Sequence, residues 1–205
     1  MDAPVYVSGA VEGPSDEPVL RRIVEERGGT VYRVQVQNGK SNLRRALPGY
    51  NAAARRSAWL VLVDLDQDHP CAGALVSEWL PAPSPFIHLR VVVHQIEAWL
   101  LADAERFASF FGVRRSAIPV DPDSVVDAKA TVVSLVSASR RAALRQDMTP
   151  REGSGRRVGP AYTSRLIDFA SNPSAGWRLD VAIEHSRSLS KCVMRLDELI
   201  ARQRR

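Results

Sequence analysis

The sequence is poor in cysteine, in lysine and in long apolar runs. Its two cysteines, Cys71 and Cys192, lie far apart, which argues against a disulfide framework and against a cysteine-based zinc site. No apolar run approaches the roughly 20 residues of a bilayer-spanning helix. The first residues also lack the basic-then-apolar order of a secretory signal. We therefore expect a protein of the reducing cytoplasm that has no membrane partner.

What the chain does contain is typical of a globular protein. Its 205 residues are 45% hydrophobic and 25% charged, which suffices for a buried core. The formal net charge is +5, and lysine occurs only at positions 40, 129 and 191. Arginine forms two-pronged contacts with phosphate, so its excess fits a nucleic-acid ligand. The codon usage of a high-GC genome explains the same excess.

Strand and helix patterns alternate along the first half of the chain. Apolar, β-branched segments predict strands at 5–11, 30–36, 59–63 and 86–93. The segments between them predict helices at 16–27, 42–56 and 72–80. A long amphipathic helix is expected from about Glu97 to a stop at Gly112. This order predicts an α/β fold with a mostly parallel, Rossmann-like sheet flanked by helices.

After Gly112 the pattern becomes helical and less regular. We expect helices over 128–146, 161–170 and 179–201, and a flexible basic segment over 148–159. These patterns predict a domain over 1–115 and a helical C-terminal extension over 116–205 packed on it. The last helix has an amphipathic face, which predicts either packing onto its own domain or a docking face for a partner.

Acidic residues follow the predicted strands, at the edge where parallel α/β sheets bind ligands. Glu12 follows the first strand, Asp64 and Asp66 follow the third, and Glu97 comes after the fourth. Carboxylates gathered at one edge repel one another unless a proton or a cation lies between them. Hard oxygen ligands of this kind select Mg²⁺ or Mn²⁺. In an extended chain, Asp64 and Asp66 point to the same side, so both reach one ion.

Each of these acids also has a plainer interpretation. Glu12 fits an ordinary turn, Glu97 favours a helix N-terminus, and Asp68, a candidate further ligand, fits a solvated turn. Asp103 is expected at the surface or behind the site, and Trp99 is expected in the core. The chain has no Gly-x-Ser-x-Gly elbow and no Gly-x-x-x-x-Gly-Lys loop, which argues against acyl transfer and against P-loop ATPase activity.

Two motifs carry a family resemblance. Glu12-Gly13-x-Ser15-Asp16 and the later Asp64-x-Asp66 resemble the signature of the Toprim domain of topoisomerases, bacterial primases and OLD-family nucleases. Ile96–Asp103 (IEAWLLAD), Val158–Thr163 (VGPAYT) and Ser188–Cys192 narrow the resemblance to a family of small bacterial Toprim-like proteins of unknown function. Members are often encoded beside an ABC-type ATPase, as in OLD-family and abortive-infection phage-defence systems. The resemblance covers nearly the whole chain, although a minimal Toprim domain lacks the C-terminal third.

The resemblance implies roles for individual residues. Glu12 corresponds to a glutamate that contacts metal or moves a proton, and Asp64 and Asp66 correspond to a metal-binding pair. Glu97 corresponds to a later metal-site acid, and Lys129 to a lysine that steadies transition-state charge. The resemblance therefore implies a Mg²⁺- or Mn²⁺-dependent nuclease acting on DNA or RNA in a phage-defence or DNA-processing system, with an ATPase partner.

Basic residues away from these acids are candidates for contacts with nucleic-acid phosphates, and solvated surface charge is their plainer interpretation. They are Lys40, Arg44, Arg45, Arg55, Arg56, Arg156 and Arg157. Two other functions stay open. One is a non-catalytic Toprim-like regulatory or adaptor subunit of an ATPase complex. The other is a different metal-dependent phosphoryl or glycosyl transferase, since Asp-x-Asp also binds metal-nucleotides.

Overall fold

The computed structural model describes residues 3–66 and 69–204, and the chain divides into two units. The first unit combines residues 1–93 with 188–205, and the second is formed by residues 94–187. This division differs from the predicted domains, 1–115 and 116–205. The difference has two causes. The C-terminal helix returns to the first unit, and the helices that follow the fourth strand pack with the later helices.

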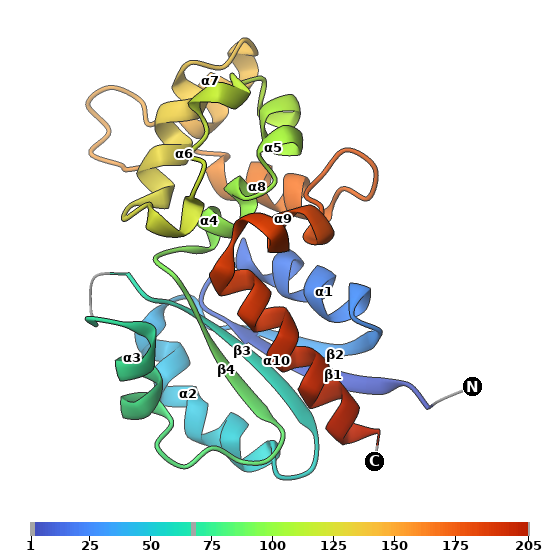
Figure 1. Ribbon diagram of the computed structural model, residues 1–205. Coiled ribbons are helices and arrows are strands. Elements are labelled where there is room, and N and C mark those ends of the chain that lie inside the picture. The colour runs from blue at the N-terminus through green and yellow to red at the C-terminus, as the bar shows by residue number, and fades with distance from the viewer. Residues whose placement is uncertain (1–2, 67–68, 205) are drawn as a thin grey trace. The chain divides into compact units, whose positions relative to one another are not determined.

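A four-stranded, all-parallel sheet forms the centre of the first unit (Figure 1). Its strands are β1 (Val5–Val11), β2 (Gly29–Val36), β3 (Ala58–Asp64) and β4 (Ile87–Val92). All four predicted strands are confirmed, as is the α/β fold class. The strand order is β2-β1-β3-β4, so the direction of winding reverses between β1 and β3. In such sheets ligands bind beyond the carboxyl ends of the strands at this switch point.

One face of the sheet is covered by α2 (Lys40–Ala53) and α3 (Ala72–Trp79), which lie together in Figure 1. Alternate side chains along a strand point to opposite faces. Trp59, Val61 and Val63 of β3 therefore share one buried cluster with Leu43 of α2 and Leu75 of α3. These apolar contacts hold α2 and α3 against the same face of the sheet.

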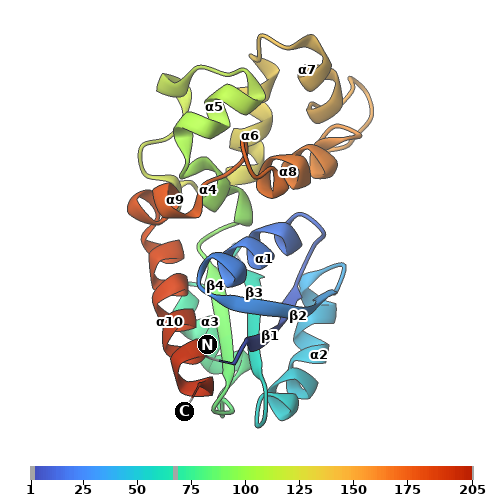
Figure 2. The ribbon, with the colours of Figure 1, turned by 90° about the vertical axis from the view of Figure 1, so that its right-hand side faces the viewer.

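The other face carries α1 (Asp16–Glu26) and α10 (Arg187–Gln203), and Figure 2 shows α10 on the opposite side of the sheet from α2. The two helices are joined by an ion pair between Arg27 and Asp197, with N and O 2.8 Å apart. Arg90 of β4 donates a hydrogen bond of 2.7 Å to the carbonyl oxygen of Ser188 at the start of α10. The apolar residues of α10 are buried, and the helix belongs to the first unit.

The second unit is helical. Its helices are α4 (Ile96–Leu101), α5 (Ala104–Phe111), α6 (Ala128–Ser137), α7 (Ala142–Met148), α8 (Tyr162–Ser171) and α9 (Leu179–His185), with short 3₁₀ turns at Arg115–Ala117 and Pro122–Ser124. In the two described stretches, none of the helices has the length and apolar character needed to cross a bilayer.

Three predicted long helices are interrupted, so those predictions are wrong. The helix expected from Glu97 breaks at Asp103, whose carboxylate accepts a hydrogen bond of 3.2 Å from the Arg106 amide and caps α5. The helix expected over 128–146 breaks between α6 and α7. The last helix breaks at Ser186, which is extended and donates a hydrogen bond of 2.8 Å to Asp123.

Asp103 does not lie at the surface, which was one of the two places expected for it, because its side chain is 0% exposed. Arg178 donates to both of its carboxylate oxygens, at 2.9 and 2.8 Å. Next to Arg178 in the sequence, the Trp177 indole donates a hydrogen bond of 2.8 Å to the Trp99 carbonyl oxygen. Both tryptophans are fully buried, which confirms Trp99 as a core residue. The acid, the arginine and the tryptophans thus join α4, α5 and the segment before α9.

Candidate active site

Glu12 and Asp64 meet where β1 and β3 end. The Glu12 carboxylate accepts a hydrogen bond of 2.8 Å from the Asp64 amide. The turn after Glu12 is held by Asp16, which is 7% exposed and accepts a hydrogen bond of 2.9 Å from the Gly13 amide. The Glu-Gly turn is therefore fixed by its own acid, and it aims the Glu12 side chain at the neighbouring strand.

Asp66 lies beside Lys40 in the same unit. The Lys40 ammonium group is 3.2 Å from an Asp66 carboxylate oxygen and donates a hydrogen bond of 3.0 Å to the Leu65 carbonyl oxygen. Gly39, which precedes α2, has φ of 126° and donates a hydrogen bond of 3.0 Å to the Glu12 carbonyl oxygen. A φ in this range favours glycine. The segments after β1, β2 and β3 therefore converge at one edge.

The backbone at Asp66 is not extended, because its φ is 50°. The prediction of an extended chain through Asp66 is therefore wrong, and a common direction of the Asp64 and Asp66 side chains no longer follows from it. A left-handed conformation is uncommon for a residue other than glycine, and such conformations concentrate at functional sites. It is this turn that carries the Asp66 carboxylate to Lys40.

Lys40 has a different place from the one its sequence suggested. It was expected on the surface as a phosphate contact, but its side chain is only 16% exposed and its ammonium group lies within the acidic site. The signal was present in the sequence, since Gly39-Lys40 follows the second strand just as Glu12-Gly13 follows the first.

The Glu12 carboxyl group has a pKa raised to about 7. Burial is the largest cause, because it disfavours the charged form. The Asp64 amide and the Lys40 charge lower the pKa, whereas the nearby charges of Asp66 and Asp16 raise it further. A carboxyl group in this range exchanges its proton near neutrality, which suits general acid–base chemistry.

The raised pKa of Glu12 makes stability depend on pH. The unfolded chain loses this proton near pH 4.5 and the folded chain near pH 7, so stability should fall as pH rises between these values and stay low above them. Glu12→Gln removes the penalty and keeps an acceptor for the Asp64 amide. We expect it to stabilise the protein by up to about 3 kcal/mol at pH 8, with little effect at pH 4.5.

Urea unfolding from pH 4.5 to pH 8 measures this difference. Glu25→Gln is the control, because Glu25 is exposed on α1 in the same unit. If the Glu12→Gln and wild-type curves ran parallel across this range, Glu12 would not be the group that carries the pH dependence.

A second cluster joins Glu97 of α4, Lys129 of α6 and Tyr162 of α8 in the second unit. One Glu97 carboxylate oxygen lies 2.5 Å from the Lys129 ammonium nitrogen and accepts a hydrogen bond of 3.1 Å from the Tyr162 hydroxyl. Glu97 is 1% exposed, and its other carboxylate oxygen has no hydrogen-bond partner among the described residues. Burial, and then the Glu97 charge, raise the pKa of Tyr162 well above its ordinary value, so the phenol keeps its proton.

The structure thus brings Glu97 and Lys129 together, and it adds Tyr162, which we did not assign a role from the sequence. Its signal was its place in the VGPAYT stretch. Glu97 also lies in the first turn of α4, as its plainer interpretation expected. Its membership of a metal site with Glu12, Asp64 and Asp66 stays a prediction. Asp68 lies outside the described residues.

The basic residues predicted to contact phosphate are on the surface, apart from Lys40. Arg44 pairs with Glu78 at 2.7 Å and stacks 5.4 Å from the Trp79 ring centroid, and Arg157 pairs with Asp127. The other arginines predicted to contact phosphate are also exposed, namely Arg45, Arg55, Arg56 and Arg156. Contacts of these side chains with nucleic acid stay a prediction.

The donors for a divalent ion are present at the acidic edge, but they are engaged by the protein. No three Asp, Glu, His or Cys side chains in residues 3–66 and 69–204 form a group arranged to hold a metal ion. Glu12 accepts from the Asp64 amide, and Lys40 contacts Asp66. Carboxylate oxygens are the ligands that Mg²⁺ prefers. Glu12 and Asp66 therefore fit a cation chemically if they exchange these protein partners for it.

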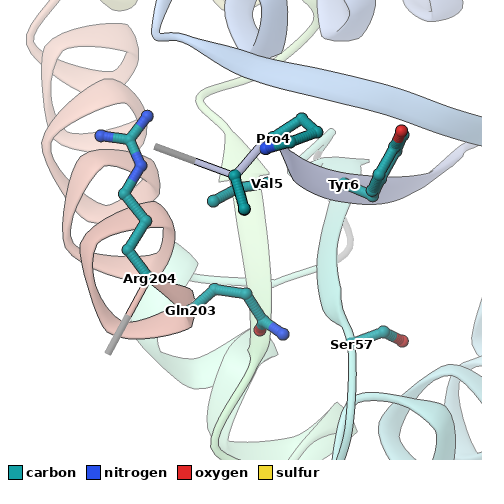
Figure 3. Close-up of a pocket in the computed structure, with 7 residues that line it drawn as sticks. Pro4, Val5, Tyr6, Ser57, Gln203 and Arg204 are labelled. Atoms are coloured by element: carbon teal, nitrogen blue, oxygen red, sulfur yellow. The ribbon is translucent and has the colours of Figure 1, made fainter. Parts of the chain in front are cut away.

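A hollow of about 460 Å³ lies away from these acids (Figure 3). It is lined by the start of β1, Ser57 and the end of α10, and Arg204 is the only charged side chain among the described residues that line it. Because β1 begins there and Glu12 follows its far end, the hollow belongs to the opposite edge of the sheet. It contributes no acid, so the candidate active site is the edge that holds Glu12, Asp64 and Asp66.

Fold and site together define an α/β protein with acidic side chains at the switch point of a parallel sheet. Comparisons with models of protein families, with curated proteins and with solved structures each found no match to this chain. The resemblance to a Toprim-like family therefore stays a prediction.

Proposed function

We propose that this chain is a Mg²⁺- or Mn²⁺-dependent nuclease that hydrolyses phosphodiester bonds of DNA or RNA at Glu12, Asp64 and Asp66. The observation that carries the proposal is the convergence of these acids and Lys40 at the switch point between β1 and β3. The Toprim-like motifs support the same assignment, and they add an ABC-type ATPase and a phage-defence setting to the proposal.

The three carboxylates would hold the cation, which when bound activates water and offsets charge on the phosphate. If Glu12 instead stays outside the cation's shell, its carboxylate would accept a proton from water, since its pKa of about 7 leaves it partly charged at neutral pH. The Asp64 amide holds that carboxylate in place. Lys40 offsets the negative charge of Asp66, and the N–H groups of its ammonium would donate hydrogen bonds to a phosphate oxygen.

The first test uses the wild-type protein with labelled single-stranded and double-stranded DNA and RNA. We expect cleavage with Mg²⁺ or Mn²⁺ and none with excess EDTA. We also expect each cation to raise the midpoint of thermal unfolding, because a ligand that binds only the folded chain stabilises it. Absence of both effects, with and without a co-expressed ATPase, would overturn the proposal.

The alternative function is a non-catalytic adaptor of an ATPase complex. The observation that favours it is the engagement of Glu12 and Asp66 by protein partners. The adaptor hypothesis offered the apolar face of the last helix as its docking surface, but that face is buried in the first unit. Its buried residues are Leu189, Cys192, Val193, Leu196, Leu199 and Ile200. Stable co-purification with an ATPase, without cleavage or cation binding, would identify the adaptor.

A further inference from the structure

Four arginines gather around a hollow of about 640 Å³ in the second unit. Arg114 and Arg115 follow α5, and Arg140 and Arg141 lie between α6 and α7. The two pairs are 25 residues or more apart in the sequence, so the tertiary structure makes this cluster. None of the four belongs to the basic residues that the sequence suggested.

Hydrogen bonds hold the two segments side by side. The Arg140 amide donates to the Gly112 carbonyl oxygen at 2.9 Å, and the buried Ser139 hydroxyl donates to the Phe111 carbonyl oxygen at 2.6 Å. The Arg141 guanidinium donates to two carbonyl oxygens at the end of α5, at 2.9 and 3.2 Å. The positions of Arg140 and Arg141 are therefore tied to the end of α5, directly before Arg114 and Arg115.

Gly112 allows this close approach. Its φ is 65°, the left-handed conformation that ends α5, and a Cβ atom there would lie 3.1 Å from the Ser139 hydroxyl oxygen and from the Arg141 Cγ atom. A side chain at position 112 would crowd the Ser139 and Arg141 side chains and would be strained at this φ. The arrangement of the arginines is thus built by the local backbone and is present without a ligand.

The positive charge of the hollow is largely uncompensated. Arg114, Arg115 and Arg140 are exposed, and they form no ion pair within the described part of the chain. The charge of Arg115 helps to lower the pKa of the nearby Glu105 carboxyl group, but this carboxylate already pairs with Arg178 at 2.8 Å. Three guanidinium groups are therefore left to bind an anion beside the anchored Arg141.

We propose that this hollow binds phosphate groups, and that the ligand is the backbone of a nucleic acid. Guanidinium groups offer paired donors that match the oxygens of phosphate, and several at one place favour a polyanion. The inference goes beyond the proposed cleavage at Glu12, Asp64 and Asp66, because binding here needs neither a metal ion nor those acids.

The test compares the wild-type protein with a double variant that carries both Arg114→Ala and Arg140→Ala. Neither side chain makes a hydrogen bond in the described structure, so the fold should be retained, and thermal unfolding checks this. Fluorescence anisotropy with labelled oligonucleotides in EDTA, from 50 to 200 mM salt, measures binding without cleavage. We expect roughly tenfold weaker binding at low salt, and a salt slope smaller by about two.

The control is the double variant Arg151→Ala with Arg187→Ala, which removes the same charge from exposed positions of the same unit outside the hollow. Pyrophosphate and free nucleotides, used as competitors, distinguish a small phosphate compound from a nucleic acid. If the Arg114/Arg140 variant lost as much affinity for small phosphate compounds as for oligonucleotides, the hollow would remain a phosphate site but its ligand would be the smaller compound. Binding of every probe by the Arg114/Arg140 variant at the control's level would overturn the inference. The binding test is done in EDTA, which abolishes the proposed cleavage, whereas the cleavage test needs the cation. A failure of one proposal can therefore be told apart from a failure of the other.

Discussion

Replacing Asp64 and Asp66 together by asparagine is expected to reduce cation-dependent phosphodiester cleavage at least about a thousandfold. The loss of two carboxylates removes the charge that holds the cation, and metal stabilisation of the transition state is worth several kcal/mol, with about 1.4 kcal/mol per factor of ten in rate. Asparagine keeps the shape of both side chains. It also tolerates the left-handed φ of 50° at position 66, so the turn beside Lys40 should persist.

Single-turnover cleavage at saturating Mg²⁺ measures this loss. The matched control is Asp121→Asn with Asp180→Asn, which removes two negative charges from exposed positions in the second unit. The Asp64/Asp66 variant should also lose the cation-induced rise in the unfolding midpoint, whereas the control should keep it. Undiminished cleavage by the Asp64/Asp66 variant would place the reaction elsewhere on the chain.

Arg178→Ala is expected to lower the free energy of unfolding by about 3–5 kcal/mol, the usual penalty for leaving a buried charge without its partner. The Asp103 carboxylate is 0% exposed, and the arginine contributes donors to both of its oxygens. Truncation leaves Asp103 with backbone donors alone, the Arg106 amide at 3.2 Å and the residue 178 amide at 3.0 Å. The start of α5 and the segment before α9 should then lose their connection.

Glu105→Ala tests the same arginine from its other side. Glu105 also pairs with Arg178 at 2.8 Å, but its side chain is 64% exposed, so its loss should change stability by less than about 1 kcal/mol. Denaturant unfolding of both variants, followed by tryptophan fluorescence, measures the contrast. Similar losses for the two substitutions would contradict a special role for the buried carboxylate.

The sheet could be predicted because its signals are local. Continuous apolar runs are typical of strands buried on both faces, as in β1 and β3, and the alternating pattern of 30–36 is typical of a strand with one exposed face. Acids that directly follow such strands must lie at one edge when the strands are parallel, so the neighbourhood of Glu12 and Asp64 followed from the pattern. The helix breaks at Asp103 and Ser186 could not be predicted in this way, because apolar periodicity continues through both positions.

The sequence by itself determined the α/β class, the strand positions to within about one residue and the placing of Glu12 and Asp64 at neighbouring strand ends, because periodicity and turn residues are properties of adjacent positions. Only the tertiary structure decided the partners of the charged groups. Lys40 reaches Asp66, Arg178 reaches Asp103, Glu97 meets Lys129 and Tyr162, and Arg140 joins Arg114. Each of these contacts joins residues at least 26 positions apart, so no local pattern could reveal it.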